Sequence, residues 1–86
     1  MFKPNPKAQA ENKFYELFGS RSDVEIDGQR LSEQDCKAMG FPPGTYSVQM
    51  KVAGNSFLMA RSTDWRKAYK NLKIAIESAY ADGKSV

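Results

Sequence analysis

The feature that most constrains the fold is a stretch of strict alternation that leads into a turn. Every second residue from Tyr46 to Val52 is apolar, which is the pattern of a strand with one buried face. Gly54-Asn55 is typical of a two-residue turn with glycine at its first central position. A second strand-like segment follows, so we expect a hairpin over residues 45–62.

The predicted turn sets the register of this hairpin and so decides which residues share a face. It pairs Val52 with Phe57, Met50 with Met59 and Val48 with Arg61, and the apolar side chains then form one face. A polar face with little charge is left on the other side. That face consists of Ser47, Gln49, Lys51, Ser56, Leu58, Ala60 and Ser62.

A long amphipathic helix is predicted directly after the hairpin, over about residues 64–82. Apolar residues recur at spacings of three and four from Trp65 to Ala79, and Thr63 or Asp64 is placed to cap the N-terminus. We expect this helix to pack on the apolar face of the hairpin, with Trp65 anchored in the core. The alternative for Trp65 is that it stacks on a base or on the plane of an arginine.

The first half of the chain supplies a second helix and a second hairpin. Asn5 followed by Pro6 is typical of a helix start, and the apolar spacing predicts a helix over 6–18. Asp27-Gly28 lies between alternating residues and predicts a hairpin over 24–31. A short helix from Ser32 to Met39 follows.

Together these elements predict the α+β class. We expect one small domain over 1–86, with loose ends at about 1–5 and 83–86. Its antiparallel sheet is formed by the hairpins 24–31 and 45–62, and it is packed by the N-terminal helix and the long C-terminal helix.

An alternative interpretation of residues 23–34 stays open. Asp23, Glu25, Asp27 and Gly28 match the opening of a calcium-binding loop, in which alternate oxygens and a glycine surround the ion. The position where such a loop needs a bidentate glutamate holds Gln34. The hairpin explains the same residues with fewer exceptions.

The composition argues against catalysis. The chain has no histidine and a single cysteine, Cys36, so a zinc site or a histidine-activated nucleophile is not expected. We therefore expect a protein that is not an enzyme and has no cofactor or metal. No apolar run is long enough to span a bilayer, and the N-terminus lacks a secretory signal, so we expect a cytoplasmic protein without a membrane partner.

The charges are unevenly distributed along the chain. Residues 11–40 hold seven acidic and four basic side chains, whereas residues 41–73 hold six basic side chains and one acidic side chain. Arg66 and Lys67 lie in the first turn of the predicted long helix, where the helix dipole disfavours cations by about 0.3–1 kcal/mol each. Cations at a position that destabilises the helix, with no neighbouring interaction to offset the cost, indicate a function. Here that function is the binding of phosphates.

Residues 45–82 resemble the ββα half of a double-stranded RNA-binding domain, with two strands followed by Arg66-Lys67-Ala68-Tyr69-Lys70 at the start of a helix. The resemblance implies an α-β-β-β-α topology in which Arg66, Lys67 and Lys70 hold duplex phosphates. Residues 20–44 depart from it with an extra helix-like segment. The stretch is also similar to AP2 and phage-integrase arm-binding modules, which implies that Gln49, Lys51 and Arg61 contact DNA from an exposed strand face.

The sequence thus predicts a small nucleic-acid-binding protein that grips duplex DNA or RNA with a basic helix start and a polar strand face. Its expected binding residues are Gln49, Lys51, Arg61, Arg66, Lys67, Lys70 and Lys73. The alternative is a protein-interaction module, such as a small phage-type or mobile-element regulator or inhibitor of a larger enzyme, with an acidic protein surface as its partner. Exposure of Leu58 beside Phe41 would favour this alternative.

Overall fold

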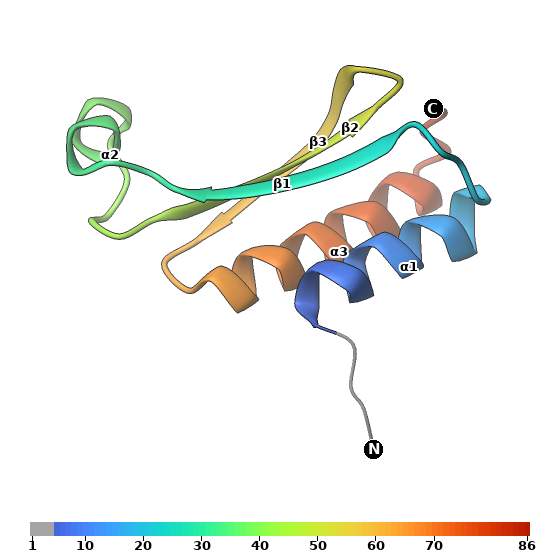
Figure 1. The fold of residues 1–86 in the computed structure, drawn as a ribbon, viewed down its shortest axis with the longest axis horizontal. Coiled ribbons are helices and arrows are strands. Elements are labelled where there is room, and N and C mark those ends of the chain that lie inside the picture. Colours follow the sequence, from blue (N-terminus) through green and yellow to red (C-terminus); the bar gives the residue numbers. More distant parts are fainter. Residues whose placement is uncertain (1–4) are drawn as a thin grey trace.

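The computed structural model describes residues 5–86 and contains three helices and a three-stranded antiparallel sheet. In chain order the elements are α1 (Pro6–Phe18), β1 (Val24–Arg30), α2 (Glu33–Met39), β2 (Tyr46–Val52), β3 (Asn55–Ser62) and α3 (Trp65–Ala81). The strand order is β1-β2-β3, and α1 and α3 lie side by side on one face of the sheet, while α2 projects from one end (Figure 1). The predicted α+β class, with both terminal helices packed on an antiparallel sheet, is confirmed. The predicted loose N-terminus lies mostly outside the described residues.

The helices begin where local chemistry predicts. The Asn5 side chain accepts a hydrogen bond from the backbone N–H of Ala8 at 2.7 Å, and Pro6 opens α1. The Ser32 hydroxyl accepts from the N–H of Asp35 at 3.1 Å, which caps α2 in the same way. These bonds satisfy N–H groups that have no partner within the helix.

The predicted hairpin over 24–31 is wrong, because β1 is one continuous strand. It pairs with β2 along its whole length, from Val24 opposite Val52 to Arg30 opposite Tyr46. Its central glycine, Gly28, faces the helices. Glycine is needed here because two tyrosine side chains lie close to its backbone, and not because the chain turns. A β-carbon at this position would lie 2.6 Å from the Tyr46 hydroxyl oxygen and closer still to that of Tyr69.

The extended strand also rules out the loop that a calcium site would need. The backbone from 24 to 30 is paired with β2 throughout and does not wrap around a centre. Asp23, just before β1, instead accepts two hydrogen bonds of 2.8 Å from the Arg21 guanidinium, which hold the pKa of its carboxyl below the ordinary value. Both sequence interpretations of residues 23–34 are therefore replaced by a strand.

The 45–62 hairpin is present, but its register differs from the predicted one. The turn residues are Ala53 and Gly54, with φ of 54° and 79°, so Val52 pairs with Asn55 rather than with Phe57. Phe57 is then an extra residue between two pairs of the ladder, a β-bulge. The different turn and the bulge together shift the register of β3 by one residue. Beyond the bulge, the side chains predicted to face the helices therefore face away from them, and the reverse. The physical reason is that Leu58 and Ala60 reach the core in this register.

The core lies between the sheet and the two long helices. Its largest fully buried side chains include Phe14 of α1, Val48 and Met50 of β2, and Leu72 and Ile76 of α3. Burial of side chains of this size stabilises the fold by roughly 1.5–3 kcal/mol each.

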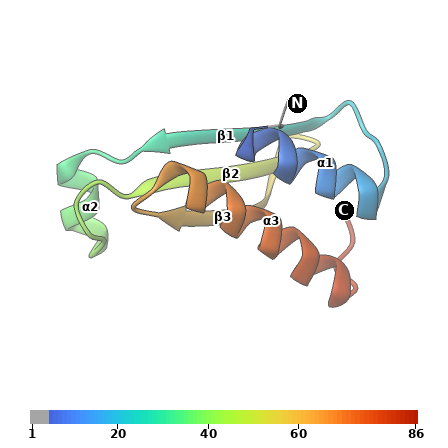
Figure 2. The same ribbon diagram turned by 90° about the horizontal axis from the view of Figure 1, so that it is seen from below.

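One residue of the predicted helix stripe does not anchor the core. Trp65 is 44% exposed, whereas Tyr69, which the stripe omitted, is buried. The view from below shows the reason, because α1 begins part of the way along α3 and leaves the first turns of α3 without a helical neighbour (Figure 2).

Candidate nucleic-acid interface

Four predicted binding residues lie together on the first half of α3. Arg66, Lys67 and Lys70 are exposed and Lys73 is half-buried. Arg66, Lys70 and Lys73 follow the i, i+4, i+7 spacing and therefore share one side of the helix. We call these four residues the α3 basic surface. The only acidic group at this end of the helix is the Asp64 cap, whose Oδ1 accepts from the backbone N–H of Arg66 at 2.9 Å.

The four cations of the α3 basic surface form no ion pair among the described residues. Within residues 5–86 the two ion pairs are Lys13 with Glu16 at 3.0 Å and Arg21 with Asp23 at 2.8 Å. Both pairs lie outside α3, so none of its four cations has a carboxylate within 4.0 Å in the described part of the chain. Asp64 is the one carboxylate of the helix start, so the four cations repel one another more than it can offset, and an anionic partner would relieve this repulsion.

The other three predicted binding residues lie on the far side of the sheet from the helices, which we call the outer face. Gln49 donates from Nε2 to the Ser56 hydroxyl at 2.9 Å, and Lys51 stands opposite Glu25 in the ladder between β1 and β2. An acidic neighbour on the adjacent strand reduces the attraction that Lys51 offers to a phosphate. The structure thus divides the seven predicted residues into two groups on opposite sides of the sheet.

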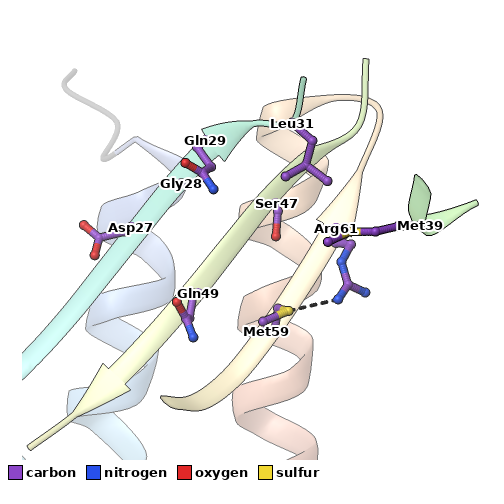
Figure 3. Close-up of a pocket in the computed structure, with 9 residues that line it drawn as sticks. All are labelled: Asp27, Gly28, Gln29, Leu31, Met39, Ser47, Gln49, Met59 and Arg61. Atoms are coloured by element: carbon purple, nitrogen blue, oxygen red, sulfur yellow. Dashed lines mark hydrogen bonds between the residues drawn. The ribbon is translucent and has the colours of Figure 1, made fainter. Parts of the chain in front are cut away.

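Arg61 reaches the outer face because of the shifted register, which moves it away from the predicted apolar side. Its guanidinium carbon lies 4.7 Å from the centre of the Phe41 ring, and Nη2 lies 3.0 Å from Sδ of Met59. Arg61 and Met59 border a shallow hollow of about 510 Å³ (Figure 3). Asp27 lines the same hollow, so the outer face carries charges of both signs.

A second hollow of about 570 Å³ lies at the start of α3, and we call it the end pocket. It is lined by Arg30, Tyr46, Thr63, Asp64, Trp65 and Arg66. Sequence reasoning missed Arg30 and Tyr46, because the predicted hairpin over 24–31 folded this segment back on itself rather than against the strand that begins at residue 46. Only the continuous β1 brings Arg30 opposite Tyr46.

Two tyrosines support the wall of the end pocket. The rings of Tyr46 and Tyr69 lie 6.0 Å apart, and Trp65 meets the Tyr69 ring edge to face at 6.2 Å. Burial of Tyr69, together with a hydrogen bond to Tyr46, raises its pKa to about 12. The Tyr69 hydroxyl is therefore protonated at neutral pH and stays in the wall as a neutral group.

The exposed apolar patch that would favour a protein partner does not form around Leu58. Leu58 is half-buried and packs against the core from the helix-facing side of β3. The exposed apolar residues near the outer-face hollow are Met59, at 46%, and Met39, at 60%.

No helix among residues 5–86 is long and apolar enough to cross a membrane, and no three histidine, cysteine, aspartate or glutamate residues in that range cluster as metal ligands would.

Comparisons with known proteins assign no function to this geometry, because the chain matches no protein-family model, no curated protein and no solved structure.

Proposed function

We propose that this protein binds duplex nucleic acid by holding its phosphates on the α3 basic surface. The observation that carries the proposal is the set of four cations on the first half of α3, three of them exposed and one half-buried, none of which has a carboxylate within 4.0 Å among the described residues. Phosphate contacts supply most of the affinity of proteins that bind nucleic acid without strong sequence preference. The first turns of α3 also extend beyond the start of α1 (Figure 2).

The spacing of the cations favours a duplex over a single strand. Arg66 and Lys73 are seven residues apart, which is about 10 Å along a helix. This distance is close to the width of about 12 Å of the major groove of B-form DNA. Phosphates on the two sides of one groove are therefore within reach of the two ends of the α3 basic surface.

The order of the helices and strands supports the proposal through the resemblance to the double-stranded RNA-binding domain. A helix, three antiparallel strands and a second helix, with both helices on one face, is the topology that the double-stranded RNA-binding domain implies. In that resemblance the start of the last helix holds the phosphates, and Arg66, Lys67 and Lys70 occupy it here. The short helix α2 between β1 and β2 is the departure.

The outer face has a lesser part in this proposal. Gln49 and Lys51 project away from α3, and a duplex lying along the α3 basic surface is separated from them by the sheet itself. We therefore assign the phosphate contacts of the duplex to α3 rather than to the outer face.

Fluorescence anisotropy of labelled duplex RNA, duplex DNA and single strands tests the proposal at salt concentrations of about 50–200 mM. For duplex DNA, Lys70→Gln removes one phosphate contact and should lower the slope of log K against log salt by about 0.9, for all sequences alike. Arg21→Gln removes the same charge near the start of β1, and Lys51→Gln removes it on the outer face. Both controls should keep the wild-type slope, and an equal loss in all three variants would contradict the assignment to α3.

One observation favours the alternative of a protein-interaction module. Met39 and Met59 expose about half of their surface or more beside the Arg61 guanidinium. Methionine and arginine are enriched in protein interfaces, and this arrangement suits a partner with an apolar residue next to a carboxylate. Absence of binding to every nucleic acid at about 50 mM salt would favour this function. A partner protein should then bind the wild type but not Met59→Asp.

A further inference from the structure

The end pocket combines an exposed aromatic ring with two arginines. Trp65 leaves 44% of its surface exposed, and the pocket beside it has a volume of about 570 Å³. Small-molecule sites commonly have volumes of about 300–1,000 Å³. Tyr69 packs against the indole and limits its movement. The ring is therefore packed on its Tyr69 side and exposes part of its surface at the edge of the α3 basic surface.

The two arginines of the end pocket use none of their guanidinium N–H donors in an ion pair among the described residues. The Arg66 guanidinium carbon lies 5.4 Å from the centre of the indole ring, and Arg30 enters from the end of β1. Neither guanidinium has a carboxylate within 4.0 Å among residues 5–86. The Asp64 carboxylate in the same pocket already accepts the backbone N–H of Arg66. Each guanidinium carries five N–H donors in a planar fork, a geometry that fits a phosphate.

We propose that the end pocket holds an unpaired nucleotide next to the duplex bound on the α3 basic surface, an inference that rests on the proposed function. The base stacks on Trp65, and the phosphate of the same nucleotide lies between Arg30 and Arg66. An aromatic platform beside guanidinium groups matches the two parts of a nucleotide, its flat base and its charged phosphate. A base inside a continuous duplex cannot reach the indole, because both of its faces are already stacked on its neighbours.

The consequence is a preference for duplexes with an unpaired residue. An overhang or a bulge presents a free base close to the duplex phosphates, whereas a blunt duplex does not. Stacking of one base on an aromatic side chain should raise the affinity roughly tenfold relative to a blunt duplex of the same length.

The single tryptophan makes this inference directly measurable. Because Trp65 is the only tryptophan in the chain, its intrinsic fluorescence reports on the end pocket alone. The protein is titrated with a blunt RNA duplex, with the same duplex carrying a two-nucleotide overhang, and with inorganic phosphate. We expect strong quenching and tighter binding with the overhang, little quenching with the blunt duplex, and none with inorganic phosphate, which has no ring to stack.

Variants separate the pocket from the helix surface. Arg30→Gln should remove the preference for the overhang and leave blunt-duplex binding unchanged, whereas Lys70→Gln should weaken binding to both duplexes by the same factor. Trp65→Leu, followed by anisotropy, should behave like Arg30→Gln. Equal affinity for both duplexes with unchanged tryptophan fluorescence would overturn the inference and leave the proposed function standing. Failure of both duplexes to bind would overturn both.

Discussion

The Gly28→Ala substitution tests why β1 is a continuous strand rather than a hairpin. Gly28 has no positive φ, so alanine itself can adopt the backbone conformation found there. The obstacle is space, because the new β-carbon would lie 2.6 Å from the Tyr46 hydroxyl oxygen, 2.7 Å from Cε1 of the same ring, and closer still to the Tyr69 hydroxyl oxygen. Tyr69 is buried, so its ring has little freedom to move away.

The size of the effect follows from two opposing contributions. Overpacking a filled site costs about 1–3 kcal/mol of unfolding free energy. Replacing glycine by alanine also lowers the entropy of the unfolded chain, which raises the unfolding free energy by about 0.4–1 kcal/mol. The midpoints of these two ranges give a net loss of about 1.3 kcal/mol, which in a domain of this size lowers the melting temperature by roughly 5–10 °C.

A double-mutant cycle with Tyr69→Phe separates this explanation from a turn. Removing the Tyr69 hydroxyl removes the nearest collision, so Gly28→Ala should cost at least about 0.5 kcal/mol less in the Tyr69→Phe background than in the wild type. Urea denaturation followed by circular dichroism measures all four proteins. If Gly28 were in a turn with positive φ, alanine would cost the same in both backgrounds. Such additivity would refute the close-approach explanation.

Three further predictions concern stability and charge. Ala53 has φ of 54°, so Ala53→Asn should stabilise the β2–β3 turn by about 0.5–1 kcal/mol in urea denaturation, and a loss of stability would contradict the turn assignment. Burial raises the pKa of Tyr69 from its ordinary value of 10.0 to about 12, so its contribution to stability is complete below pH 10 and is lost as pH rises to about 12. Tyr69→Phe should make stability less dependent on pH in that window, and an unchanged dependence would argue against the buried hydroxyl. Asp64→Asn keeps the helix cap but removes a negative charge beside Arg66, so duplex affinity should rise with little change in melting temperature; lower affinity would count against phosphate binding at this helix end.

The helices were predictable because their signals are local. The cap at Asn5 and the cap at Ser32 lie within three residues of the N–H groups that they bind. The apolar spacing from Ala68 to Ala79 likewise defines most of the buried side of α3 without reference to other elements, although it omits Tyr69. The positions of the α3 cations followed from the same local pattern.

The pairing of β1 with β2 and the register of β3 were not predictable, because their causes lie far apart in the sequence. Gly28 is a glycine because of Tyr46 and Tyr69, and no local pattern links those residues. The register of β3 depends on a bulge at Phe57, which the packing of Leu58 and Ala60 against the core requires. Both features are decided by tertiary packing.

The same non-local contacts decided how much of the candidate site could be predicted. Arg30 joins Trp65 and Arg66 only when β1 is continuous, so the end pocket could not be derived from the sequence. The separation of Lys51 from α3, in contrast, follows from the alternation in residues 46–52, which puts Lys51 on the polar face of the strand and α3 on its apolar face.

The most direct test of the central claim is an amide chemical-shift map of the ¹⁵N-labelled protein with a short duplex carrying an overhang. We expect the largest shifts at the backbone amides of Arg66, Lys67 and Lys70 and at the indole N–H of Trp65, with little change at Lys51 and Gln49. Shifts centred on Gln49, Lys51 and Met59 would place the duplex on the outer face. That result would contradict the assignment of phosphate binding to α3.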